Sequence, residues 1–351
     1  MSRLKIISTL IESHVLTSFH DRSAKGITKT IFSKQKALIA ILVMFIIMAF
    51  SSSNFYASGA QFLDHMDRIF IVASPDLIIA FGVTLAVICR GCDLSVGAVM
   101  SMSGVLAIYM LNAGMPVFFA VAIAILSGSV VGFINGFLIV QQKTEAFIIT
   151  LGMGLLIKGV ALYLTNANPI TSQNAAFNAI SNTTILGLPS IVMYMLLIGV
   201  LIFCLLRFTS FGRNCYALGG DYEVAEHSGI NVLRTKWIAF VITGTCAAIA
   251  GVLYASRVHT GSAIYGDLTP LMVNCGVVIG GTSFAGGIGG IPQSFVGIMV
   301  MHFLRYFMRL FRVDGVLPNI NPFVQTLVLG IVIVAIIAMD CYTIKRKKED
   351  V

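Results

Sequence analysis

Residues 116–140 read PVFFAVAIAILSGSVVGFINGFLIV, a stretch without Asp, Glu, Lys or Arg. About 20 apolar residues in an α-helix are enough to cross the ~30 Å hydrocarbon core of a bilayer, so this stretch predicts a transmembrane helix. Similar apolar stretches recur between residues 37 and 338. The sequence therefore predicts an all-α, polytopic integral membrane protein.

The composition of the whole chain agrees with this fold class. Of its 351 residues, 57% are hydrophobic and 11% are charged, and the mean hydropathy is +0.93. A soluble fold of this length cannot bury so much apolar surface, so lipid must cover the remainder. No soluble domain fits between the apolar stretches.

Hydropathy, Gly and Pro breaks and polar clusters divide the apolar region into about ten expected spans. They are residues 37–57, 69–89, 94–113, 116–140, 146–165, 190–207, 236–256, 270–283, 290–309 and 322–340. Gly-rich breaks interrupt the regions 69–113 and 270–309, where a short or broken helix gives the same pattern. Glycines 128, 132 and 136 within one span are typical of close helix packing.

The formal net charge of +8 is concentrated at the two ends of the chain. The segment 1–36 and the tail 341–351 are both basic and flank a transmembrane domain at 37–340. The positive-inside rule places both ends in the cytoplasm, which requires an even number of spans. We therefore expect the charge to anchor the chain at a bacterial cytoplasmic membrane, with lipid rather than nucleic acid as its partner.

The loops support this orientation with one exception. The uncharged loop 166–189 falls outside and the charged segment 207–236 falls inside. Arg305, Arg309 and Arg312 also fall outside, against the rule. Two alternatives explain this exception: the segment is an amphipathic stretch at the membrane interface, or one of the expected spans around it is wrong.

Residues 207–236 form the longest charged stretch within the membrane region. Asp221 can cap a helix, Glu223 suits its first turn, and Gly229 is placed to end it. We expect a short helix on the cytoplasmic surface. Spacing alone leaves open whether it binds a partner or is a solvated loop.

Several kinds of chemistry have no sequence signature. The chain has no G-x-x-x-x-G-K-[ST] motif, and its Gly-rich run 280–290 has no lysine to reach a phosphate. It has no H-E-x-x-H motif, and its six histidines are scattered. Cysteines 89 and 92 have the spacing of a redox motif but lack a second pair, and cysteines in apolar runs are ordinary small hydrophobes. We therefore expect a non-catalytic chain that binds no metal or cofactor, so that any ATP is hydrolysed elsewhere.

Asp93 is the most conspicuous charge in the apolar region. A carboxylate at the bilayer centre costs about 2.5–3.5 kcal/mol on insertion scales, so it needs a partner or water. Arg90 is the nearest candidate partner. An N-cap role after a glycine turn is equally compatible with the sequence, and both roles can coexist if the turn lines a cavity.

Amide and hydroxyl groups in a dry span also need partners. Asn135 and Thr150 are such residues, and either a polyol passing between helices or another helix could satisfy them. Our candidates for a substrate path are Asp93, Ser95, Asn135, Thr150, Gly152, Thr282 and Ser283.

Four ordered stretches carry a resemblance to a known family. They are residues 91–97 (GCDLSVG), 147–153 (FIITLGM), 212–232 (GRNCYALGGDYEVAEHSGINV) and 280–283 (GGTS) with the glycines that follow. The chain resembles the membrane permease subunit of ribose-type carbohydrate ATP-binding-cassette importers over about residues 70–340. This family also includes permeases for other pentoses, hexoses and a furanosyl signal.

The resemblance implies partners and roles. It implies a second permease subunit, a cytoplasmic ATPase that binds ATP and Mg²⁺, and an extracytoplasmic sugar-binding protein that delivers cargo. It also implies that the segment 207–236 couples the permease to the ATPase. The residues implied for coupling are Gly212, Arg213, Gly219, Glu223, Ala225, Glu226 and Gly229.

The sequence departs from the family pattern at two places. Glu145-Ala146 replaces the proline that commonly precedes the 147–153 stretch, and residues 271–274 (LMVN) replace an acidic turn. The second change could alter the wall of the pathway, so the identity of the sugar stays open.

The expected mechanism is alternating access, driven by ATP binding and hydrolysis on the partner chain. A proton- or ion-coupled secondary transporter that uses Asp93 is the alternative from another class. A membrane scaffold that transports nothing is the third.

Overall fold

The computed structural model describes residues 59–142, 144–310, 324–328, 330, 331 and 334. The expected span 37–57, most of 322–340 and the basic ends 1–36 and 341–351 lie outside the described residues. The helices are α4 (Gly59–Ile88), α5 (Val96–Asn112), α6 (Val117–Gln142), α7 (Ala146–Thr165), α8 (Ala175–Asn182), α9 (Ser190–Phe208), α10 (Ser210–Gly220), α11 (Tyr222–His227), α12 (Val232–Val258), α13 (Thr269–Ile279) and α14 (Ile291–Leu310). Four two-residue strands, β1 (Ile170–Thr171), β2 (Thr184–Ile185), β3 (Leu188–Pro189) and β4 (Thr260–Gly261), pair antiparallel as β1–β4 and β2–β3.

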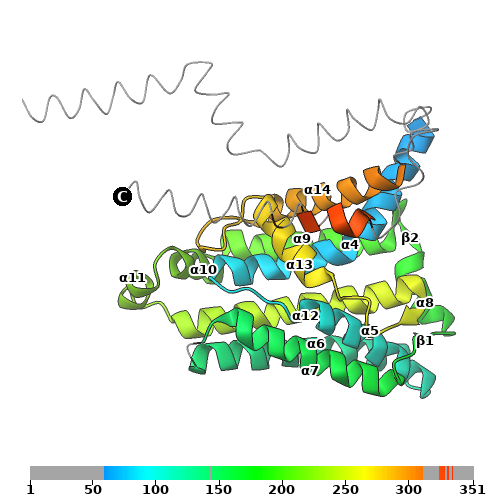
Figure 1. The fold of residues 1–351 in the computed structure, drawn as a ribbon, viewed down its shortest axis with the longest axis horizontal. Coiled ribbons are helices and arrows are strands. Elements are labelled where there is room, and N and C mark those ends of the chain that lie inside the picture. The colour runs from blue at the N-terminus through cyan, green and yellow to red at the C-terminus, as the bar shows by residue number, and fades with distance from the viewer. Residues whose placement is uncertain (1–58, 143, 311–323, 329, 332–333, 335–351) are drawn as a thin grey trace, which may run out of the picture.

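The long helices lie side by side in one bundle (Figure 1). Among the described residues, five helices are long and apolar enough to cross a membrane: α4, α6, α7, α9 and α12. At one end of the bundle α10 and α11 project beyond it, and at the other end α8 and the short strands cover it (Figure 1). We call these the α11 end and the α8 end. The all-α, polytopic membrane fold expected from the sequence is confirmed.

Burial separates the helices into an inner and an outer group. In the most apolar window of α4, 83% of the residues are buried, compared with 11% in α7. The inner helix α12 packs on α4, α5 and α6. The packing role of the α6 glycines is confirmed, because a Cβ on Gly132 would lie 2.4 Å from the carbonyl oxygen of Phe240 in α12. Small residues therefore let the two backbones approach, as is common between helices in lipid.

The same pattern of a long helix, a non-helical return and a half-length helix occurs twice. The chain follows α4 to the α11 end, returns through residues 89–95 to about mid-depth, and continues as α5 toward the α8 end (Figure 1). It later follows α12 to the α8 end, returns through 259–268, and continues as α13 toward the α11 end (Figure 1). The two units thus have opposite directions in the membrane, an arrangement that places discontinuous helices at the midplane.

The starts of the two half-length helices meet through two glycines. A Cβ on Gly97 would lie 2.1 Å from the carbonyl oxygen of Gly266, and a Cβ on Gly266 would lie 1.9 Å from that of Gly97. The Ser101 hydroxyl also accepts a hydrogen bond from the Gly266 amide at 2.9 Å. Glycine is therefore required at both positions for this approach.

Several expected boundaries were wrong. The helix expected at 69–89 begins at Gly59, the one expected at 236–256 runs from Val232 to Val258, and the one expected at 270–283 ends at Ile279. The loop 166–189 contains α8, and the segment 207–236 contains α10 in addition to the expected short helix. The flanking residues are polar or glycine-rich, and packing rather than hydropathy decides where these helices end.

Candidate functional site

Asp93 and Ser95 lie in the return between α4 and α5, and both are buried. One carboxylate oxygen of Asp93 accepts hydrogen bonds from the Ser95 amide at 2.8 Å and from the Ser95 hydroxyl at 2.7 Å. The other oxygen has no hydrogen-bond partner among the described residues. Arg90 points elsewhere and is not the partner of Asp93. The carboxylate therefore fixes the turn that precedes α5, although Ser95 rather than Asp93 is the N-cap residue.

Three other helices hold this turn. The Asn135 amide of α6 donates to the Ser95 hydroxyl at 2.9 Å, and the Asn274 amide of α13 donates to the Asp93 carbonyl at 3.1 Å. The Thr150 hydroxyl of α7 accepts from the Leu94 amide at 3.1 Å. Protein groups thus satisfy the Thr150 hydroxyl and the amide nitrogen of Asn135, while the side-chain oxygen of Asn135 has no hydrogen-bond partner among the described residues. The predicted path residues Asp93, Ser95, Asn135 and Thr150 thus come together as one buried network.

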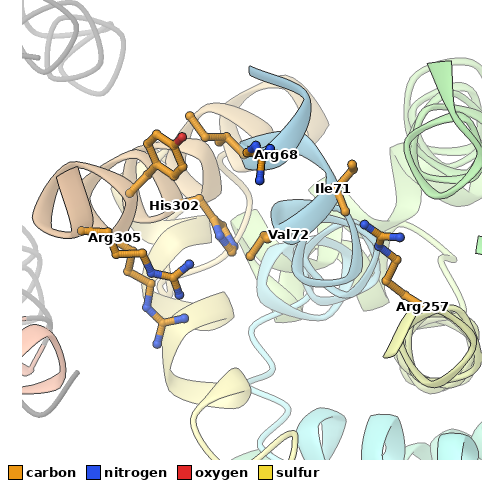
Figure 2. Close-up of a pocket in the computed structure, with 9 residues that line it drawn as sticks. Arg68, Ile71, Val72, Arg257, His302 and Arg305 are labelled. Carbon is orange, nitrogen blue, oxygen red and sulfur yellow. The ribbon is translucent and has the colours of Figure 1, made fainter. Parts of the chain in front are cut away.

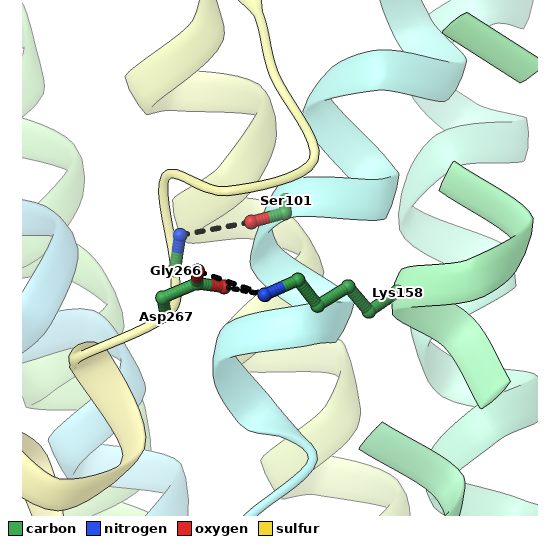
Figure 3. A network of polar contacts seen from close by, with 4 residues as sticks. All are labelled: Ser101, Lys158, Gly266 and Asp267. Atoms are coloured by element: carbon green, nitrogen blue, oxygen red, sulfur yellow. Dashed lines mark hydrogen bonds and ion pairs between the residues drawn. The ribbon is translucent and has the colours of Figure 1, made fainter. Parts of the chain in front are cut away.

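A cavity of about 400 Å³ adjoins this network. Its walls come from the start of α5, the middle of α7 and the start of α13, including Leu94, Gly154 and Leu271. Lys158 and Asp267 also line it, and the lysine nitrogen lies 2.7 and 2.8 Å from the two carboxylate oxygens (Figure 3). The cavity is therefore apolar on most sides and carries one ion pair at its wall.

The sequence reasoning missed this ion pair. Its signal was Lys158, a lone lysine within the apolar span 146–165, which needs an acidic partner or water in lipid. The partner could not be identified from spacing, because Asp267 is 109 residues away. Their side chains are 33% and 44% exposed, so both can contact a molecule in the cavity.

The remaining predicted path residues do not line this cavity. Gly152 is on the exposed side of α7, with nothing within 4 Å of a Cβ built on it. Thr282 is fully buried with its hydroxyl 3.3 Å from that of Ser294, and Ser283 accepts a hydrogen bond from the Ala285 amide. The structure therefore does not bring Gly152, Thr282 and Ser283 to the network around Asp93.

The expected short helix at the α11 end is present as α11. The Asp221 side chain accepts a hydrogen bond from the Val224 amide at 3.0 Å, and Gly229 has a φ of +79° just beyond the helix. Ala225 is buried, while Glu223 and Glu226 are exposed. The helix thus packs on one side and presents two carboxylates on the other.

The preceding helix α10 connects α11 to the bundle through glycines. A Cβ on Gly212 would lie 1.9 Å from the carbonyl oxygen of Leu206, so the corner between α9 and α10 needs glycine. Arg213 is exposed and donates to the Ser210 hydroxyl at 2.8 Å. The cation of α10 and the carboxylates of α11 are therefore accessible at the same end of the bundle (Figure 1).

Arg90 ties α10 to the end of α4. Its guanidinium donates to the carbonyls of Gly219 at 2.9 Å and Gly220 at 2.6 Å, and Arg90 itself has a φ of +55°. The Gly287 amide donates to the Ile88 carbonyl at 3.0 Å, which brings the Gly-rich run to the same place. Hydrogen bonds thus join the end of α4 both to α10 and to the segment between α13 and α14. Sequence reasoning missed this role, because the bonded carbonyls carry no signature.

Comparison with known proteins gives consistent relationships. Residues 65–337 match a family described as branched-chain amino acid transport system / permease component. The ribose import permease protein of Haemophilus influenzae is 30% identical over 318 residues, which are 90% of this chain and 95% of the relative. The L-arabinose transport system permease protein of Escherichia coli is 30% identical over 328 residues, or 93% and 98% of the two chains.

A third relative has a different sugar in its name. The D-allose transport system permease protein of Escherichia coli is 31% identical over 278 residues, covering 79% of this chain and 83% of the relative. No solved structure matches the chain. The family match extends over more than half of the chain, and these relatives are sugar permeases. The chain therefore belongs to this permease family, within the group that serves ribose-type carbohydrate ATP-binding-cassette importers.

Proposed function

We propose that the chain conducts a monosaccharide, a ribose-like pentose, a hexose or a related furanosyl sugar, into the cytoplasm by alternating access. The observation that carries this proposal is the near full-length similarity to permeases named for ribose, arabinose and allose. Monosaccharides of this kind are neutral polyols, which need hydrogen-bonding groups but no net charge along their path.

The proposed path runs along the cavity at the starts of α5 and α13. Its volume of about 400 Å³ accommodates a single sugar ring. The ion pair of Lys158 and Asp267 offers donors and acceptors to sugar hydroxyls. In this proposal Asp93, Ser95, Asn135 and Thr150 position α5, and Gly152, Thr282 and Ser283 are retained as path residues for another conformation.

The proposed coupling surface is formed by α10 and α11. Arg213, Glu223 and Glu226 supply its exposed charges, and Gly212, Gly219, Ala225 and Gly229 shape its backbone. A separate ATPase binds ATP and Mg²⁺, docks on this surface, and moves the bundle through Arg90. The α11 end and both chain ends are then cytoplasmic, and an extracytoplasmic sugar-binding protein delivers cargo at the α8 end. A second permease subunit completes the pathway.

Uptake by cells tests this proposal. Bacteria without their own pentose and hexose importers receive the chain with its ATPase and binding protein, and labelled ribose, arabinose and allose are offered in turn. We expect at least one sugar to accumulate, and accumulation to stop when the ATPase carries an inactivating Walker-A substitution. Accumulation that survives this substitution but collapses with the proton gradient would instead support the secondary transporter.

A further inference from the structure

A second cavity, of about 420 Å³, lies at the α8 end of the bundle. Its walls come from the first half of α4, the end of α12 and the end of α14 (Figure 2). It shares no lining residue with the cavity at the starts of α5 and α13. It is therefore distinct from the cavity lined by Lys158 and Asp267.

The walls of this cavity are strongly cationic. Four arginines line it, Arg68, Arg257, Arg305 and Arg309, and none of its described lining residues is acidic. Figure 2 shows Arg305 on the α14 side and Arg257 on the α12 side, so the charges approach the cavity from different helices. Like charges gathered around one space repel each other, and an anion bound between them offsets this repulsion.

Local partners neutralise only part of this charge. Arg68 forms an ion pair with Asp64 at 2.9 Å, and Arg257 hydrogen-bonds to the neutral side chain of Asn182. Asp76 lies 3.0 Å from a ring nitrogen of His302, and its charge also acts on Arg305 from beyond salt-bridge distance. Among the described residues, Arg305 and Arg309 have no salt bridge within 4.0 Å. Within the described part of the chain, two guanidinium groups on this wall are thus without a carboxylate at salt-bridge distance.

Membrane topology does not explain these arginines. In the proposed orientation the α8 end faces outward, where the positive-inside rule disfavours clustered arginine. A guanidinium presents a planar fork of donors that matches the paired oxygens of a carboxylate or phosphate. A neutral sugar offers hydroxyls but no charge. The arrangement therefore fits an oxyanion better than it fits the neutral cargo.

We propose that the cavity lined by Arg257, Arg305 and Arg309 binds an oxyanion, a carboxylate or phosphate group. A sugar acid or sugar phosphate in solution and the head group of an acidic phospholipid both carry this chemistry. The binding concerns the chain alone and requires neither the ATPase nor transport.

Thermal unfolding of the purified chain in nanodiscs tests the proposal. Phosphate, gluconate and the neutral control ribose are titrated in phosphatidylcholine nanodiscs at constant ionic strength set with sodium chloride. A parallel sample contains phosphatidylglycerol. Ligands that bind only the folded state stabilise it by RT ln(1 + L/Kd), where L is the ligand concentration, so the unfolding midpoint rises with the logarithm of ligand concentration once that concentration exceeds the dissociation constant.

We expect phosphate or gluconate, or phosphatidylglycerol alone, to raise the midpoint. The first result identifies a soluble anion and the second a lipid head group. Arg305→Gln should weaken the binding at least about tenfold, because a charge-assisted hydrogen bond is lost. Arg309→Gln, at an exposed position, tests the same charge with little risk to folding, and exposed Arg234→Gln at the α11 end is the matched control.

Two results overturn the proposal. In one, none of the three anionic probes raises the midpoint above the chloride reference. In the other, Arg305→Gln and Arg309→Gln both respond to the probes as Arg234→Gln does. Neither result bears on sugar uptake, so failure of the oxyanion site and failure of the transport proposal are distinguishable.

Discussion

At the scale of single residues, Arg90 makes the contact with the clearest mechanical consequence. Its guanidinium joins α4 to the last two carbonyls of α10. We predict that Arg90→Gln lowers ATP-driven uptake by about tenfold, since hydrogen bonds from a charged donor are worth roughly 1.5–3 kcal/mol. ATPase activity of the assembled transporter should persist.

The measurement is sugar uptake and ATP hydrolysis by the same proteoliposomes. Arg234→Gln is the control, because Arg234 is exposed at the same end of the bundle and no described side chain forms a salt bridge with it. Equal uptake by Arg90→Gln and Arg234→Gln would show that the Arg90 contact transmits nothing.

Substitution of Asp93 distinguishes two roles of its carboxylate: holding the turn before α5, or coupling transport to a proton or ion. Its bonded oxygen accepts from the amide and hydroxyl of Ser95, and an asparagine oxygen can do the same. We predict that Asp93→Asn retains most ATP-driven uptake. Asp93→Leu should lower the unfolding midpoint, because it leaves the buried amide and hydroxyl of Ser95 without an acceptor, at a cost of about 1–3 kcal/mol. Uptake and thermal unfolding are measured on the same preparations. Loss of all uptake in Asp93→Asn, together with proton dependence in the wild type, would favour the secondary transporter.

The pair formed by Lys158 and Asp267 belongs to the proposed path. Removing one partner leaves an unpaired charge in the membrane, whereas removing both does not. We predict that Lys158→Met raises the KM for sugar uptake and slows transport, and that Lys158→Met/Asp267→Leu recovers part of the rate but not the KM. Uptake kinetics over a range of sugar concentrations measure both quantities. A normal KM in both variants would show that the ion pair does not contact the transported sugar.

At the scale of helices, the two half-length elements depend on the crossing of Gly97 and Gly266. A methyl group at Gly97 would lie 2.1 Å from a backbone oxygen, so the helix starts must separate. We predict that Gly97→Ala lowers stability by about 1–3 kcal/mol, the usual cost of overpacking. Gly159→Ala in α7 is the control, because nothing lies within 4 Å of its Cβ. Thermal unfolding in detergent compares the two variants. Equal midpoints would contradict the close approach of Gly97 and Gly266.

Hydropathy predicted the fold class and the approximate places of α6, α7 and α9, because a long apolar segment in lipid satisfies its backbone hydrogen bonds by forming a helix. It left α5 and α13 uncertain, because Gly-rich breaks interrupt the apolar sequence in the regions 69–113 and 270–309. Local capping rules located α11 from Asp221 and Gly229. The network of Asp93 with Asn135 and Asn274, however, joins distant helices, and single-sequence spacing cannot identify such contacts.

At the scale of the whole molecule, the two oppositely directed units bring polar groups together near the starts of α5 and α13, and exposed charged residues lie at both ends of the bundle. The chain belongs to a family of membrane permeases, and the central proposal is that its helices α10 and α11 bind a separate ATPase. The surface carries Arg213 on one helix and Glu223 and Glu226 on the next. Reversal of charge there should weaken docking while leaving the transmembrane bundle intact.

Co-purification measures this docking most directly. Membranes that contain the chain and its ATPase are extracted in mild detergent, and the wild type is compared with Arg213→Glu/Glu223→Lys for bound ATPase activity. The account predicts that ATPase activity accompanies the wild type and is lost from the double variant, which should unfold at the same temperature. An ATPase that never associates with the wild type, even after gentle cross-linking, would contradict the account.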